Sequence, residues 1–119
     1  MAQQPSLVSR RYPYLDISFT IGGVAHTGEA LVDTGFDGAF IFPISLTSAL
    51  PVEDEWTPWG LVDGSVVLAP SYRAAVRIGA FPSFSAVGHA VGAEFLLGRT
   101  IVDQFAVTFD HGQRVIVQL

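Results

Sequence analysis

The segment of residues 30–42 places one acidic tripeptide between two strongly apolar runs. The run Ala30-Leu31-Val32 leads into Asp33-Thr34-Gly35, and the run Ala39-Phe40-Ile41-Phe42 follows shortly after it. Short apolar runs bounded by glycine are typical of buried strands. An ionised carboxyl group is very costly to bury at such a place without a partner. The Asp33 side chain is therefore predicted to be paired, protonated or chemically active.

Each residue of the tripeptide has a chemical use at such a turn. Asp33 can accept or donate a proton, and the Thr34 hydroxyl can hydrogen-bond neighbouring backbone. Gly35 allows a sharp turn and leaves its N–H accessible beside the carboxyl group, because it has no Cβ. An ordinary turn between two strands would use the same residue types. The apolar flanks favour the chemical interpretation.

The rest of the chain also reads as short strands. Two-residue alternation predicts half-buried strands at residues 14–21 and 72–78, and Gly22-Gly23 predicts a hairpin turn between the first of these and residues 24–32. A helical turn is expected over residues 100–104, and residues 44–50 fit either a helical turn or a loose connection. The other expected strands lie at residues 39–42, 56–62 and 65–68, within 81–91, before Gly98, and at 105–109 and 114–119. This spacing predicts an all-β, barrel-like fold.

A second apolar run lies far downstream and meets a glycine, in Glu94-Phe95-Leu96-Leu97-Gly98-Arg99. Between the two runs, Asp63-Gly64 stands among strand-like residues and predicts a hairpin. In this order the three stretches resemble the retropepsin-like aspartic proteases, and more narrowly their cellular and bacterial members, where Phe and Gly surround the active turn as in Phe36-Asp37-Gly38. The resemblance covers residues 14–119. It implies an acid-protease barrel with a flap hairpin, one or two short helical turns and half an active site per chain.

Aspartic-protease chemistry needs two carboxyl groups that share one water molecule. One acts as a base on the water while the other, protonated, hydrogen-bonds the scissile carbonyl group. Two carboxylates about 3 Å apart cannot both ionise, so the pair holds one proton, as in aspartic proteases generally. A homodimer with Asp33, Thr34 and Gly35 of each chain at a two-fold axis is therefore expected, without metal or organic cofactor. The other aspartates lack the flanking pattern: Asp16, Asp37, Asp54, Asp63, Asp103 and Asp110.

The resemblance also implies supporting and substrate-binding roles. Leu97, Gly98 and Arg99 would be structural support, with Gly98 allowing close backbone approach. Arg99 would pair with Asp37 behind the active turn, the alternative being two exposed charges. The hairpin of residues 59–66 would be a flap over an extended peptide, although it also fits an ordinary surface hairpin. The residues expected to bind substrate are Phe36, Asp37, Trp59, Gly60, Leu61 and Val62, the apolar ones of which would also fit an ordinary core.

Composition narrows the classes of function. With 119 residues, 50% of them hydrophobic and 14% charged, the chain suits one folded domain and not a disordered one. The net charge is −5, and the basic residues are six arginines scattered along the sequence. The sequence therefore shows no basic patch of the kind that binds nucleic acid. The absence of Cys rules out disulfides and thiolate metal sites. His26, His89 and His111 do not have the spacing of a zinc site.

Two units are expected along the chain: an N-terminal arm over residues 1–13, a possible dimer-interface strand, and a retropepsin-like domain over residues 14–119. No apolar run approaches the ~20 residues of a membrane span, so no membrane contact is expected. The N-terminal Met1-Ala2-Gln3-Gln4-Pro5 lacks a signal-peptide core, which favours a cytoplasmic location.

The predicted function is that of a homodimeric aspartic endopeptidase acting on extended peptide or protein substrates. The alternative is a catalytically silent retropepsin-fold domain that serves as a dimerisation or peptide-binding module. A small β-barrel that binds an unrelated ligand is the third possibility, since a fold alone does not fix a function.

Overall fold

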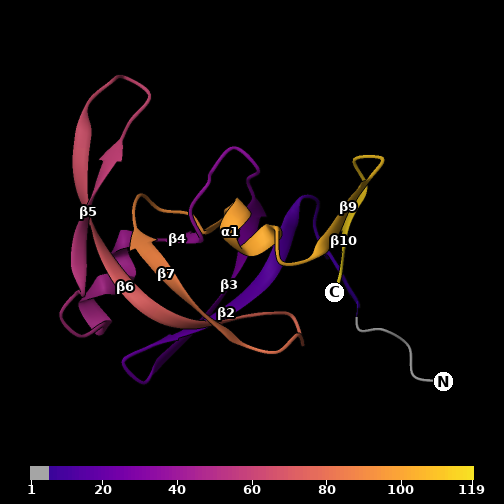
Figure 1. The fold of residues 1–119 in the computed structure, drawn as a ribbon, viewed down its shortest axis with the longest axis horizontal. Helices are drawn as coiled ribbons and strands as arrows, with labels where there is room; N and C mark the ends of the chain where they lie inside the picture. Colours follow the sequence, from indigo (N-terminus) through magenta and orange to yellow (C-terminus); the bar gives the residue numbers. More distant parts are fainter. Residues whose placement is uncertain (1–5) are drawn as a thin grey trace.

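Ten strands and two short helices make up residues 6–119, the part of the chain that the computed structural model describes (Figure 1). The predicted all-β class is confirmed. In chain order the elements are β1 (Ser6–Val8), β2 (Tyr14–Ile21), β3 (Val24–Val32), β4 (Phe40–Phe42), the 3₁₀ helix η1 (Ile44–Ala49), β5 (Glu55–Gly60), β6 (Val66–Ile78), β7 (Phe84–Ala90), β8 (Leu96–Leu97), α1 (Arg99–Val102), β9 (Ala106–Asp110) and β10 (Arg114–Gln118).

Six strands close a barrel, as the spacing of the strands predicts. Around it, β2 pairs with β3, β3 with β8, β8 with β4, β4 with β7, and β7 with β6, which returns to pair with β2. The fifth strand, β5, extends this sheet beyond β6. Closure pairs the sheet edges that would otherwise be exposed.

The core fills the barrel from alternate positions of its strands. On β2, every second residue is at most 3% exposed: Leu15, Ile17, Phe19 and Ile21. The rings of Phe19, Phe40 and Phe42 pack at centroid distances of 5.1–5.9 Å. Side chains of a strand point alternately to its two faces. The alternation of apolar and polar residues along β2 therefore corresponds to one face that is buried in the core.

One long strand replaces two predicted ones. Residues 65–68 and 72–78 belong largely to the single strand β6, which continues through Pro70. Proline donates no backbone hydrogen bond and is tolerated where a strand has one open side. Pro70 pairs with Trp56 of β5, and pairing with β7 begins only at Ser71. For residues 44–50 the sequence fits either a helical turn or a loose connection, and the structure shows mostly the 3₁₀ helix η1.

A second, three-stranded sheet in the order β1-β10-β9 lies at the end of the molecule opposite the β5–β6 hairpin (Figure 1). The predicted C-terminal strand pair is confirmed, and His111 turns between its strands with a φ of 51°. Residues 6–8 of the predicted arm pair with β10 of the same chain. Residues 1–5 lie outside the described part, and the division into 1–13 and 14–119 stays a prediction. No helix within residues 6–119 is long and apolar enough to cross a membrane.

Candidate active site

The Asp33-Thr34-Gly35 turn follows directly on the end of β3. The backbone N–H of Asp33 donates to the carbonyl oxygen of Leu97 at 2.9 Å, which ties the turn to β8. The N–H of Gly35 donates to Oδ1 of Asp33, also at 2.9 Å. The half-buried Asp33 carboxyl group is thus oriented by the backbone of its own turn. The Thr34 side chain is exposed, and its hydroxyl makes no hydrogen bond to residues 6–119.

The loop of residues 36–39 is held against the start of α1 by main-chain hydrogen bonds. The N–H groups of Gly98, Arg99 and Thr100 donate to carbonyl oxygens of this loop over 2.8–3.2 Å. The Thr100 hydroxyl donates to one more at 2.8 Å. A Cβ atom on Gly98 would overlap the carbonyl oxygen of Gly38. The close backbone approach expected at Gly98 is therefore present.

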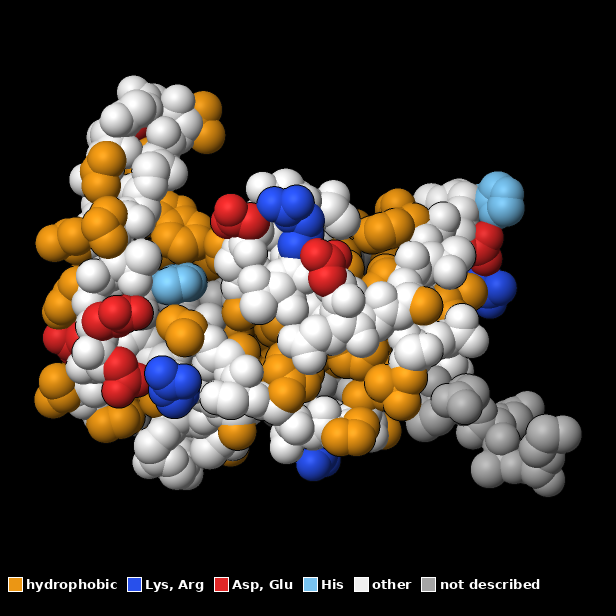
Figure 2. All heavy atoms as spheres, viewed as in Figure 1, with side chains coloured by type: hydrophobic (Ala, Val, Ile, Leu, Met, Phe, Trp, Pro, Cys, Tyr) orange, Lys and Arg blue, Asp and Glu red, His pale blue; other side chains and the backbone are white. Residues whose placement is uncertain are grey.

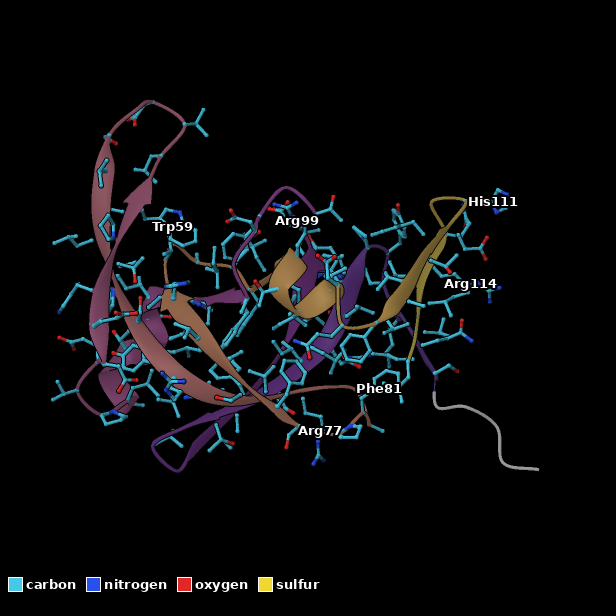
Figure 3. The ribbon with its side chains drawn as sticks, viewed as in Figure 1. Trp59, Arg77, Phe81, Arg99, His111 and Arg114 are labelled. Carbon is cyan, nitrogen blue, oxygen red and sulfur yellow. The ribbon has the colours of Figure 1, made fainter. Side chains whose placement is uncertain are left out.

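The ion pair expected between Asp37 and Arg99 is absent. Both residues are exposed, Arg99 lies at the outer surface (Figure 3), and the four ion pairs among residues 6–119 involve other side chains. An exposed pair gains little in water. The two segments are already joined through the backbone, where the N–H of Arg99 binds the Phe36 carbonyl oxygen at 2.8 Å.

A cavity of about 550 Å³ opens beside Asp33 between the Asp33-Thr34-Gly35 turn and the β5–β6 hairpin. Three further lining features were not predicted: Ile41, Leu96 and the loop of residues 91–94. The predicted residues Thr34, Asp37 and Leu61 do not line it, and all three are exposed. The predicted site residues that do line it are Asp33, Gly35, Phe36, Trp59, Gly60 and Val62.

The β5–β6 hairpin stands off the body of the molecule, with a hollow between them (Figure 2). At its base the Trp59 ring packs against the Phe36 ring at a centroid distance of 5.3 Å. Beyond that contact the hairpin side chains are exposed, Val62 fully so. At the tip, the hydroxyl and the N–H of Ser65 donate to Asp63 at 2.6 and 2.9 Å, and these bonds lower the pKa of Asp63.

A polar network ties the base of the hairpin to β7. The fully buried Ser71 hydroxyl lies 2.7 Å from the Thr57 hydroxyl and 2.7 Å from Nδ1 of His89. The His89 ring also packs against Trp59 at 5.3 Å. Burial lowers the pKa of His89, although the charge of Glu55 opposes this shift. Within the described residues, no group of three His, Asp or Glu side chains is placed to hold a metal ion.

Comparison with known proteins identifies the fold. No protein-family model and no curated protein matches the chain. Among solved structures, the chain is similar to a retropepsin-like aspartic protease from Rickettsia conorii, with a TM-score of 0.64 and 17% sequence identity. The alignment covers 97% of this chain and 91% of that one. The barrel, its helical turn and its projecting hairpin therefore form a retropepsin-like fold.

Proposed function

We propose that this chain is one half of a homodimeric aspartic endopeptidase. The observation that carries the proposal is the placement of Asp33. Its carboxyl group is held by the Gly35 N–H at 2.9 Å on the wall of a cavity large enough for a substrate side chain. The retropepsin-like fold supports the same assignment.

In the proposed reaction, two Asp33 carboxyl groups hold one proton and one water molecule between them. The ionised group takes a proton from the water as its oxygen attacks the scissile carbonyl carbon, and the protonated group hydrogen-bonds the carbonyl oxygen. The proton then moves to the leaving amine as the C–N bond breaks. Because the carboxyl groups act as a coupled pair, their titration belongs to the pair and not to one residue.

The second carboxyl group comes from an identical chain. The sequence contains a single Asp-Thr-Gly, so a two-fold axis between two active turns is the simplest source of the partner acid. The exposed Thr34 hydroxyl, without a hydrogen bond inside residues 6–119, is available to brace the turn of the partner. We assign the supporting role to Leu97, Gly98 and Arg99 through their backbone, since Leu97 and Arg99 bond to both sides of the active turn.

The β5–β6 hairpin is assigned as the flap over the substrate. An extended peptide in the cavity would lie between the active turn and the hairpin, where backbone groups can bind it as an added strand. Trp59, Gly60 and Val62 line the cavity from the hairpin side, and Phe36 lines it from the turn. Closure of the hairpin would exclude bulk water from the carboxyl pair.

The test is a peptide-library digest with the parent protein and the Asp33→Asn variant across pH, with a transition-state-mimicking inhibitor of aspartic proteases as control. We expect cleavage at acidic to mildly acidic pH that the inhibitor blocks. The variant should fold normally and lose activity by roughly 10²–10⁴-fold, the usual contribution of acid–base catalysis. An Asp33→Asn protein as active as the parent would refute the proposal. Peptide binding without cleavage by the parent would instead indicate the catalytically silent module.

A further inference from the structure

We propose that Glu94 makes the cavity select a basic side chain next to the scissile bond. This inference rests on the proposed function and names a substrate class for the same site. Glu94 belongs to the loop between β7 and β8 and lines the same cavity as Asp33. Its position in the sequence gives no hint of this, because Glu94 lies far downstream of Asp33, beyond the strands β4, β5, β6 and β7.

The loop that carries Glu94 is fixed to the barrel at both ends. On the β7 side, the N–H of Val91 donates to the Phe42 carbonyl oxygen at 3.1 Å. On the β8 side, the Phe95 carbonyl oxygen accepts from the N–H of Leu31 at 2.9 Å. Leu96 then pairs in register with Leu31, two residues before Asp33. Glu94 is therefore held on the cavity wall by the same strands that position the active turn.

The charge of Glu94 has no ion-pair partner among the described residues, 6–119. The cavity lining contains two acidic residues, Asp33 and Glu94, and no Arg or His. Glu94 makes no ion pair and no side-chain hydrogen bond with residues 6–119. In the proposed reaction the two Asp33 carboxyl groups hold one proton between them and bind the water molecule. Glu94 is therefore the carboxylate in the cavity that can bind a cationic group of the substrate.

The rest of the cavity suits the stem of a long cationic side chain. Phe36, Ile41, Trp59 and Leu96 give it an apolar wall. Lys and Arg bury their methylene groups along such surfaces and keep the charged end near a carboxylate. The faces of Phe36 and Trp59 would add cation–π attraction. The net charge of −5 would also favour the approach of cationic peptides.

The two-fold axis of the proposed dimer adds a second Glu94 to the shared site. One Glu94 would lie on each side of the scissile bond, so a basic residue is favoured on either side of the cut. A purely apolar preference is the competing outcome, because most of the lining is apolar.

The test compares two peptides that differ only in Arg or Met beside the cut, using the parent, Glu94→Gln and Asp103→Asn. Asp103 is exposed and outside the cavity, so its variant removes the same unit of charge elsewhere. We expect kcat/KM of the parent to favour Arg, and Glu94→Gln to lower that ratio roughly two- to fivefold, as for an exposed ion pair. Asp103→Asn should leave it unchanged. The preference should weaken at high salt.

A ratio that is the same in the parent and in Glu94→Gln, with both peptides cut, would overturn the role of Glu94. Binding of uncleavable hydroxyethylene analogues of the two peptides separates this failure from failure of the proposed function. If nothing is cut, tighter binding of the Arg analogue that Glu94→Gln weakens supports the Glu94 role and contradicts only the peptidase assignment. Equal binding of the two analogues contradicts the Glu94 role itself.

Discussion

At the scale of single residues, the candidate site depends on glycine as much as on the carboxyl group. The N–H of Gly35 donates a hydrogen bond to the Asp33 carboxyl group, and Gly98 lets the start of α1 contact the loop after the Asp33-Thr34-Gly35 turn. A Cβ atom at Gly35 would lie 3.2 Å from Oδ1 of Asp33, and one at Gly98 would overlap the Gly38 carbonyl oxygen. The position of Asp33 therefore depends on backbone hydrogen bonds from Gly35 and to Leu97, and the loop after it depends on the close approach at Gly98.

Replacement of Gly98 by Ala tests this packing. The added Cβ would overlap the Gly38 carbonyl oxygen, so we expect Gly98→Ala to lower the free energy of unfolding by about 1–3 kcal/mol, the usual cost of overpacking. Chemical denaturation measures this change. Gly60→Ala is the matched control, because a Cβ at Gly60 meets no atom within 4 Å. Equal stability of the two variants would show that the contact is not a tight one.

At the scale of elements, the β5–β6 hairpin is anchored through one face only. Trp59 lies on the inner face, against Phe36 and His89. Trp56, three residues earlier on β5, points to the opposite face of the strand and is 53% exposed. The mobility of the hairpin should therefore depend on Trp59 and on the Ser71 network below it.

Trp59→Ala should loosen the hairpin, whereas Trp56→Ala should not. Each aromatic pair contributes about 0.5–1.5 kcal/mol, so amide hydrogen exchange of residues 57–69 should accelerate roughly two- to tenfold in Trp59→Ala. In the proposed mechanism the hairpin is the flap, so the efficiency of peptide cleavage should also fall in Trp59→Ala, because a looser flap would close over the substrate less often. Equal exchange rates in the two tryptophan variants would contradict the anchoring role of Trp59.

Much of the fold was predictable because local signals agree with the tertiary structure. β2 and β3 match the predicted strands to the residue, since alternation and the positive φ angles of Gly22 and Gly23 both act locally. The continuity of β6 through Pro70 was missed, because it depends on which neighbours the strand has. The pairing of β1 with β10 was missed for the same reason.

The candidate site was predictable only where it is contiguous in sequence. Asp33-Thr34-Gly35 is one motif, so its placement at the end of a buried strand followed from its flanks. The prediction of an ion pair between Asp37 and Arg99 was wrong, because an exposed ion pair contributes too little free energy to fix the positions of its side chains. Glu94 was not found, because a cavity wall is assembled from distant segments and its loop offers no motif.

At the scale of the whole molecule, one chain presents a closed barrel with half of a proposed active centre. The small β1-β10-β9 sheet has two outer strands, β1 and β9, which carry the exposed apolar residues Val8 and Phe109, and the exposed Leu119 follows β10. An open sheet edge can pair with a second chain. The N-terminal strand β1 thus has an open edge, which fits the possible interface strand that the sequence predicts, whereas the C-terminal strand β10 is paired on both sides.

The central claim, that two chains share one active centre, is tested most directly by mixing. Parent chains are equilibrated with Asp33→Asn chains, and peptide cleavage is measured per parent chain. With equal amounts and random pairing, half of the parent chains lie in mixed dimers, so activity should fall to about half and should keep falling as the variant is added in excess. Activity per parent chain that stays constant at every ratio would show that one chain suffices and would contradict the account.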